Sequence, residues 1–206
     1  GGAVSAMPYT DLHFHEQQMW QEYRNATIAS VKQRLIRQLY NTVSDESVTD
    51  SIYNVWADKS DPLLSKTDYT QIAYRLAILK PQQWQKILQK QRTRLSDADE
   101  IRQFDFISRA CTPDVDEQQR LFNSLLKAEN RRIEPWTASL LRLLNDRTRE
   151  PLNNRYLQPA LDALLDVQRT GDIFFPGKWL SALLSGHHSE EARLSVATCN
   201  SQHHAY

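Results

Sequence analysis

The chain has 206 residues, of which 40% are hydrophobic and 24% charged, so it can bury a sizeable core and is not disordered as a whole. Its 25 basic and 25 acidic residues give a formal net charge of zero, which argues against nucleic acid or an acidic membrane surface as the main partner. No apolar stretch approaches the roughly 20 residues that a bilayer span requires, so no membrane span is expected.

The distribution of glycine favours helices over most of the chain. None of the five glycines lies between Ala3 and Thr170. Two-residue hairpin turns favour glycine because their central residues need positive φ, so a hairpin-rich β protein is disfavoured. We expect residues 1–11 to be an edge or linker, and residues 12–206 to form a single α-helical domain.

Apolar residues recur with helical period and predict roughly ten helices of about three turns each. A first helix, around 11–23, is rich in Gln, Glu and His and is expected to be loosely attached. The apolar stripes that follow it lie at 28–39, 52–56, 69–79, 84–95, 101–111, 121–126, 136–144, 157–165, 179–184 and 192–196.

Prolines and acidic residues mark the starts of several predicted helices. Proline suits the first helical position, because its missing N–H would have no partner there in any case. We expect Thr112 to cap a helix that starts at Pro113, and the segment 96–99 to form a capping box with Asp in place of Glu. Pro81 and Pro135 mark similar starts.

Short loops between these helices would make neighbouring helices antiparallel. One apolar stripe per helix does not easily close a compact bundle of ten. The sequence therefore predicts stacked helix pairs, a right-handed α-solenoid or superhelix of HEAT- or ARM-like pairs. A compact orthogonal helical domain is the alternative architecture.

The sequence offers no catalytic or metal-binding constellation. A glycine-free body excludes phosphate-binding loops from most of the chain, and no Gly-x-Ser-x-Gly elbow occurs. His15 begins a segment like the zinc motif His-Glu-x-x-His, but Met19 stands where the second histidine should be, so solvated surface residues are expected. Cys199 and His203 stand four apart, yet no metal site is expected there. Cys111 lies on an apolar stripe and is expected to be a buried structural thiol.

Arginines gather between residues 131 and 149, around a predicted helix that contains Trp136. Such a cluster can bind a substrate carboxylate in a cavity, and Arg132 and Arg142 are the candidates for that contact. Ion pairs with neighbours such as Asp146 and Glu150 are the alternative interpretation.

The segment 171–179 interrupts the helical pattern. Gly171 is placed to end the preceding helix in a left-handed cap. Ile173, Phe174 and Phe175 are expected to turn inward and, with Trp179, to form a buried aromatic plug between helix pairs. A wall of a ligand cavity is the alternative.

Four segments carry a resemblance to a known family. They are 101–110, 132–136, 156–161 and 168–176, with Trp179 close behind, and the last contains Gln-Arg-Thr-Gly-Asp-Ile-Phe-Phe-Pro. Together they resemble the C-terminal helical domain of zinc-dependent aminopeptidases of the aminopeptidase N type. The resemblance is good over about 99–186 and rests only on helical texture over 12–95.

The resemblance implies a role rather than a catalytic site. In that family, the catalytic domain precedes the helical domain and carries His-Glu-x-x-His and Gly-x-Met-Glu-Asn motifs, neither of which occurs here. The resemblance thus implies a domain without cofactor, which caps the active site of a zinc enzyme, encloses its cavity and limits peptide access. Its partners would be its own catalytic domain and peptide substrates. A free-standing α-solenoid that binds other proteins is the alternative function.

Overall fold

The computed structural model describes residues 9–187 together with 194 and 197. Over this part of the chain there are helices and turns but no strand, which confirms the predicted all-α class. None of the described helices is long and apolar enough to cross a membrane. Most of the predicted stripe 192–196, and both Cys199 and His203, lie outside the described residues.

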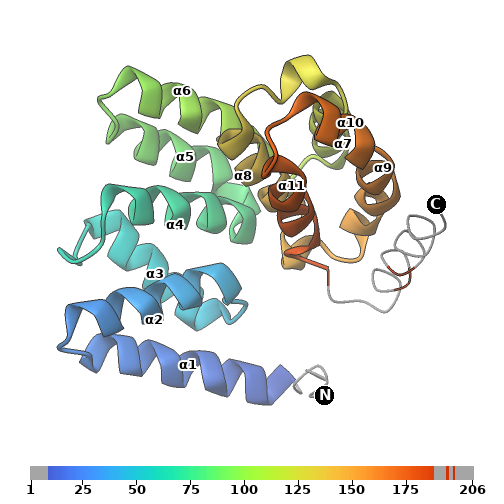
Figure 1. Ribbon diagram of the computed structural model, residues 1–206. Coiled ribbons are helices and arrows are strands. Elements are labelled where there is room, and N and C mark those ends of the chain that lie inside the picture. Colours follow the sequence, from blue (N-terminus) through green and yellow to red (C-terminus); the bar gives the residue numbers. More distant parts are fainter. Residues whose placement is uncertain (1–8, 188–193, 195–196, 198–206) are drawn as a thin grey trace. The chain divides into compact units, whose positions relative to one another are not determined.

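The chain divides into two compact units, Gly1–Thr93 and Arg94–Tyr206. The expectation of a single domain over 12–206 is not tested by this division and stays a prediction. The elements of unit 1 (Figure 1) are α1 (Tyr9–Asn25), α2 (Ala29–Thr42), α3 (Glu46–Asp58), α4 (Lys66–Leu79), the 3-10 turn η1 (Pro81–Gln83) and α5 (Trp84–Thr93).

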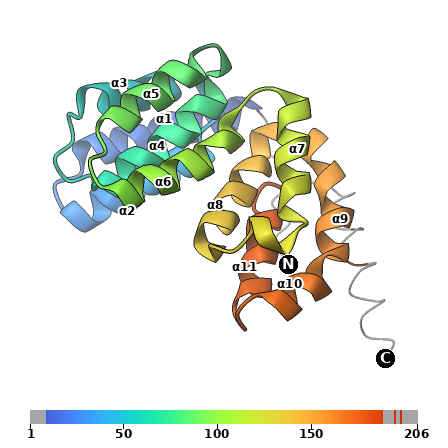
Figure 2. The same cartoon turned by 90° about the horizontal axis from the view of Figure 1, so that it is seen from above.

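Unit 2 has shorter helices and more 3-10 turns than unit 1. Its elements are α6 (Ala98–Ile107), η2 (Ser108–Cys111), α7 (Val115–Leu125), η3 (Ala128–Asn130), α8 (Glu134–Leu144), η4 (Arg147–Arg149), η5 (Leu152–Tyr156), α9 (Leu157–Asp162), α10 (Leu164–Thr170) and α11 (Phe175–Leu184). Figure 2 shows α7, α8, α9, α10 and α11 grouped around a common centre.

Aspartates, rather than the predicted Thr112 and Ser96, cap the first two helices of unit 2. Asp114 accepts hydrogen bonds from the backbone N–H groups of two residues in the first turn of α7, at 2.9 and 3.0 Å. Asp97 does the same at the start of α6. Pro113 therefore lies before α7 and not inside it. A carboxylate that accepts two N–H groups also suits the positive end of the helix dipole, which explains the shift.

The helices of unit 1 pack on one another. Helix α1 contacts α2, α2 and α3 both contact α4, and α4 contacts α5. Each of the helices α2 to α5 supplies a fully buried isoleucine: Ile36, Ile52, Ile72 and Ile87. The buried Trp56 indole donates from Nε1 to Oε1 of Gln91 at 2.9 Å. The predicted apolar stripes thus supply much of this interior, but Ile28, at the start of the stripe 28–39, is 62% exposed.

Helix α1 is not loosely attached, contrary to the prediction. Its aromatic residues Trp20 and Tyr23 are buried. Glu16 is buried as well, and its carboxylate accepts backbone N–H groups from Ser44 at 3.0 Å and Asp45 at 2.6 Å. These two N–H groups precede the first turn of α3, where a carboxylate is stabilised by the helix dipole. One of the abundant polar residues of α1, Glu16, therefore anchors this helix to the start of α3.

A second carboxylate, Asp68, connects α2 to the start of α4. Arg37 donates to it from Nε at 2.9 Å and from Nη2 at 3.2 Å. Ser65 donates to it from its backbone N at 3.0 Å and from its hydroxyl at 2.9 Å, which completes a capping box. Burial by itself raises the pKa of Asp68, but these hydrogen bonds offset burial, so the pKa lies below its usual 3.8.

We expect unit 1 to lose stability as pH falls below about 3.8, the usual pKa of Asp68. A carboxyl whose folded pKa is depressed contributes stability above its unfolded pKa and loses that contribution as pH falls through the folded value. Asp68→Asn should lower the free energy of unfolding at pH 7 by about 1–3 kcal/mol and flatten the acid limb. Urea unfolding between pH 2 and 7 measures both. Asp58→Asn, at an exposed position, is the control, and an equal loss there would contradict the assignment.

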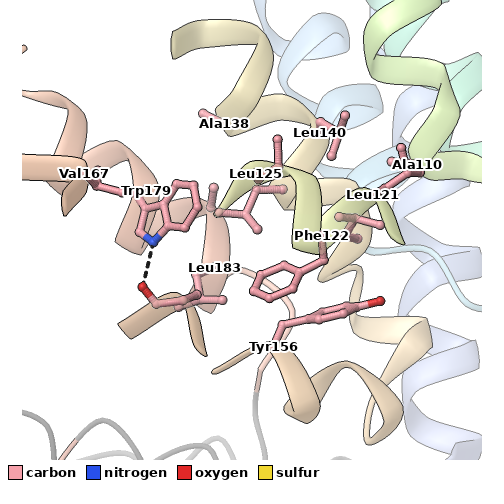
Figure 3. Close-up of a cluster of buried hydrophobic side chains, with 14 of the residues drawn as sticks. Ala110, Leu121, Phe122, Leu125, Ala138, Leu140, Tyr156, Val167, Trp179 and Leu183 are labelled. Carbon is pink, nitrogen blue, oxygen red and sulfur yellow. Dashed lines mark hydrogen bonds between the residues drawn. The ribbon is translucent and has the colours of Figure 1, made fainter. Parts of the chain in front are cut away.

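The core of unit 2 is aromatic and leucine-rich (Figure 3). Phe122 of α7 stacks on Tyr156 with ring centroids 4.5 Å apart. Trp179 of α11 is fully buried and donates from Nε1 to the carbonyl oxygen of Ala160 at 3.0 Å. Helix α8 runs through this core with Leu140, Leu141 and Leu144 fully buried. Because α8 contacts α6, α7 and α11, its position sets the geometry of the candidate site.

Candidate functional site

The turn between α10 and α11 holds the segment that the sequence singled out. Gly171 ends α10 with φ −102° and ψ 177°, an extended conformation and not the left-handed cap that was predicted. Glycine is required there by close approach instead. A Cβ atom on Gly171 would lie 2.7 Å from Cδ1 of Phe175 and 2.9 Å from the carbonyl oxygen of Val167.

Glu134, at the start of α8, holds this turn in place. Its Oε1 accepts the backbone N–H of Asp172 at 2.8 Å. The Asp172 carboxylate in turn accepts the backbone N–H of Phe174 at 2.7 Å. The direction in which the chain enters α11 is therefore set by two backbone N–H groups that donate to carboxylates.

Only part of the predicted aromatic plug lies inside. Phe175 and Trp179 are buried and meet edge to face, with ring centroids 6.2 Å apart. Phe174 is 71% exposed and Ile173 is 87% exposed, so the prediction that both turn inward is wrong. The tight turn that begins at Gly171 points adjacent side chains in different directions, and only Phe175 reaches the core.

The predicted basic cluster separates into residues with different roles. Arg131 is buried, and it donates to the carbonyl oxygen of Leu125 at 3.0 Å and to the hydroxyl of Thr170 at 3.1 Å. Its guanidinium also forms an ion pair with Asp166. This arginine connects the end of α7 to α10 and is not available to a ligand.

Arg149 is also a structural anchor. It donates to the carbonyl oxygens of Ala110 at 2.6 Å and Thr112 at 3.1 Å. These carbonyls belong to the stretch between α6 and α7, which has few helical hydrogen bonds of its own. Two members of the arginine cluster, Arg131 and Arg149, therefore stabilise the interior of unit 2.

Arg142 is the predicted candidate that the structure places at a cavity. It lies on a face of α8 that lines, with the start of α11, an open groove of about 590 Å³. Arg132 is exposed but does not line this cavity. We call it the α8–α11 groove, and its lining residues are Pro135, Ala138, Ser139 and Arg142 from α8, and Phe174, Gly177, Lys178 and Ser181 from α11 and the residue before it.

Cys111 is fully buried at the end of η2, and burial raises the pKa of its thiol to about 12. We expect this thiol to resist alkylation by iodoacetamide at pH 8 in the native protein, because the thiolate is the reactive form. It should react at the rate of an ordinary thiol once the chain is unfolded in urea. Peptide mapping by mass spectrometry distinguishes it from Cys199, and rapid native labelling of Cys111 would contradict the assignment.

The described part of the chain contains no group of three or more His, Cys, Asp or Glu side chains that could hold a metal ion. The segment that begins at His15 does not form such a group either. Glu16 is committed to backbone N–H groups, and His13 contacts Asp45, so the expectation that these residues are merely solvated is wrong for Glu16. The residues described here do not fit a zinc site.

The four segments that carry the aminopeptidase resemblance pack against one another in unit 2. The rings of Phe106 and Trp136 lie 5.9 Å apart, which joins 101–110 to 132–136. The contact from Glu134 to Asp172 joins 132–136 to 168–176. The hydrogen bond from Trp179 to Ala160 adds the segment 156–161. No family model, curated protein or solved structure matches the chain. The resemblance therefore stays a prediction.

Lys178 and Phe174 line the groove beside Arg142. Phe174 was expected in a buried plug, but the alternative for the segment 171–179, a wall of a ligand cavity, agrees better with its exposed position. A signal for this wall was available, since Phe174, Gly177, Lys178 and Ser181 follow the spacing of one helical face.

Proposed function

We propose that the chain is the non-catalytic C-terminal helical domain of a zinc-dependent aminopeptidase of the aminopeptidase N type. The single observation that supports this is the packing of the four resembling segments against one another in unit 2. Contacts between residues up to 38 positions apart join them, namely Phe106 with Trp136, Glu134 with Asp172, and Trp179 with Ala160. A resemblance confined to residues that hold one fold together points to a shared domain rather than to a chance string.

In this proposal the domain caps the active site, encloses the substrate cavity and limits which peptides enter. The zinc belongs to a catalytic domain elsewhere in the full enzyme, because the described residues do not fit a zinc site. The partners are that catalytic domain and the peptide substrates. Arg142 is the preferred cavity-facing residue, because it is exposed at an open groove, and Arg132 is the second candidate.

The proposal includes the stacked helix pairs of a right-handed α-solenoid. The packing of α1 on α2, of α2 and α3 on α4, and of α4 on α5 supports it, since these helices bury apolar residues against their neighbours. The shorter helices and 3-10 turns of unit 2 agree less well with regular repeats.

The test starts from the gene. We expect the reading frame upstream of this segment to encode His-Glu-x-x-His, and the full-length enzyme to hydrolyse amino-acid anilides with bound zinc. The 206-residue chain alone should bind no stoichiometric zinc and hydrolyse nothing. A native start codon at Met7 would overturn the proposal in favour of a free-standing interaction module, and zinc-dependent hydrolysis by the chain alone would overturn the non-catalytic role.

In the full-length enzyme, Arg142→Ala should raise KM for peptides while leaving kcat for a small anilide unchanged, because the residue is expected to contact only longer substrates. Arg120→Ala is the matched control, since Arg120 is an exposed arginine of α7 that pairs with Glu117. An unchanged KM across peptide lengths would remove Arg142 from the proposed cavity.

A further inference from the structure

The α8–α11 groove is built from matching faces of two packed helices. On α8, the lining residues Pro135, Ala138, Ser139 and Arg142 follow the spacing i, i+3, i+4, i+7. Phe174, Gly177, Lys178 and Ser181 repeat that spacing at α11. Residues so spaced share one face of a helix, so the groove runs along both helices. Its volume of about 590 Å³ lies within the range of known ligand sites.

Small side chains at Ala138, Ser139, Gly177 and Ser181 leave the space between the helices open. A Cβ atom added to Gly177 would meet no atom within 4 Å. An occupant could therefore approach the surface of α11 without any rearrangement of the fold.

The wall of the groove carries an exposed aromatic side chain. Phe174 is 71% exposed, and its neighbour Ile173 is 87% exposed. Covering a side chain of this size removes its apolar surface from water and so stabilises a complex. An exposed aromatic residue in the wall of a cavity, with an exposed isoleucine next to it in the sequence, is typical of an interaction site rather than of scattered surface residues.

The charged residues that line the groove are both basic. Arg142 and Lys178 line it, and no carboxylate does. Neither cation forms an ion pair within the described part of the chain. An acidic occupant would therefore gain two charge-assisted contacts without displacing an existing partner.

We propose that the α8–α11 groove docks an acidic segment of a partner protein, with a large apolar side chain against Phe174 and carboxylates near Arg142 and Lys178. An anionic membrane is a poorer fit, because recognition of anionic lipid typically uses clusters of four or more basic residues, and this groove has two. The inference shares Arg142 and the groove with the proposed substrate cavity, but its test uses the 206-residue chain alone and needs no catalytic domain.

The test uses a fluorescein-labelled, C-terminally amidated peptide, Glu-Asp-Leu-Phe-Glu-Glu, and the 206-residue chain. Fluorescence anisotropy should show saturable binding that weakens as salt is added. The same peptide with Lys in place of every Glu and Asp should bind at least about tenfold more weakly, because the groove would repel it. Absence of binding by the acidic peptide, or equal binding of the two peptides, overturns the proposal.

Two charge variants locate the site. Gly177→Glu places a carboxylate in the groove where nothing obstructs it, and should weaken binding about tenfold or more. Gln168→Glu, which adds the same charge at an exposed position of α10 outside the groove, should bind as the parent chain does. Equal affinity of both variants would overturn the site. If the chain sediments with phosphatidylserine vesicles and does not bind the acidic peptide, the proposal is overturned in favour of a lipid surface.

Discussion

Gly186→Ala is expected to destabilise unit 2 by about 3 kcal/mol or more, a loss of roughly 10 °C in the unfolding midpoint. A Cβ atom on Gly186 would lie 1.5 Å from the carbonyl oxygen of Asn145 and 2.8 Å from the backbone nitrogen of Arg147. Both obstacles belong to the main chain that follows α8, so the end of α11 and that segment would have to separate. Thermal and urea unfolding followed by circular dichroism measures the loss.

Gly177→Ala is the matched control for this prediction. Gly177 lies in the first turn of α11 with open space around it, and alanine is a better helix former by up to about 1 kcal/mol. We expect this variant to be as stable as the parent or slightly more stable. Equal destabilisation of the two variants would mean that close packing at Gly186 is not the cause.

Arg131→Met should lower the free energy of unfolding by about 2–4 kcal/mol, which is the second large effect that we expect. The change leaves the carbonyl of Leu125 and the hydroxyl of Thr170 without a buried donor, and it removes the ion pair with Asp166. We expect most of this loss of stability to come from the buried hydrogen bonds and little from the ion pair, because the Asp166 side chain is 55% exposed and its pairing is screened by solvent.

Arg132→Met provides the comparison, since its side chain is exposed and follows directly in the sequence. Its stability should stay within about 0.5 kcal/mol of the parent, as surface substitutions usually do. If both substitutions destabilised the chain equally, the loss would come from net charge and not from the buried contacts of Arg131.

The helical class and the core were predictable, because burial follows helical period. The stripes that placed Ile36, Ile52 and Ile72 on one face are buried in the structure. Helix α1 was misjudged because composition does not show that a single carboxylate, Glu16, reaches backbone N–H groups near the start of α3.

The candidate site was less predictable, because it lies where the helical period is interrupted. Arg131 and Arg132 are the same residue type at adjacent positions just before α8, yet only Arg131 is buried. Phe174 and Phe175 differ in the same way within a turn. In a regular helix the 3.6-residue period would distinguish such neighbours, but outside a helix only tertiary contacts decide.

The arginines that donate to carbonyl oxygens also bear on how unit 2 responds to its solvent. The bonds from Arg131 to Leu125 and from Arg149 to Ala110 join a cation to peptide dipoles. Dissolved ions weaken attraction between exposed charges over about 10 Å at 0.1 M, but they do not enter a short contact of this kind. The contribution of these two hydrogen bonds to the stability of unit 2 should therefore change little between low ionic strength and about 1 M sodium chloride.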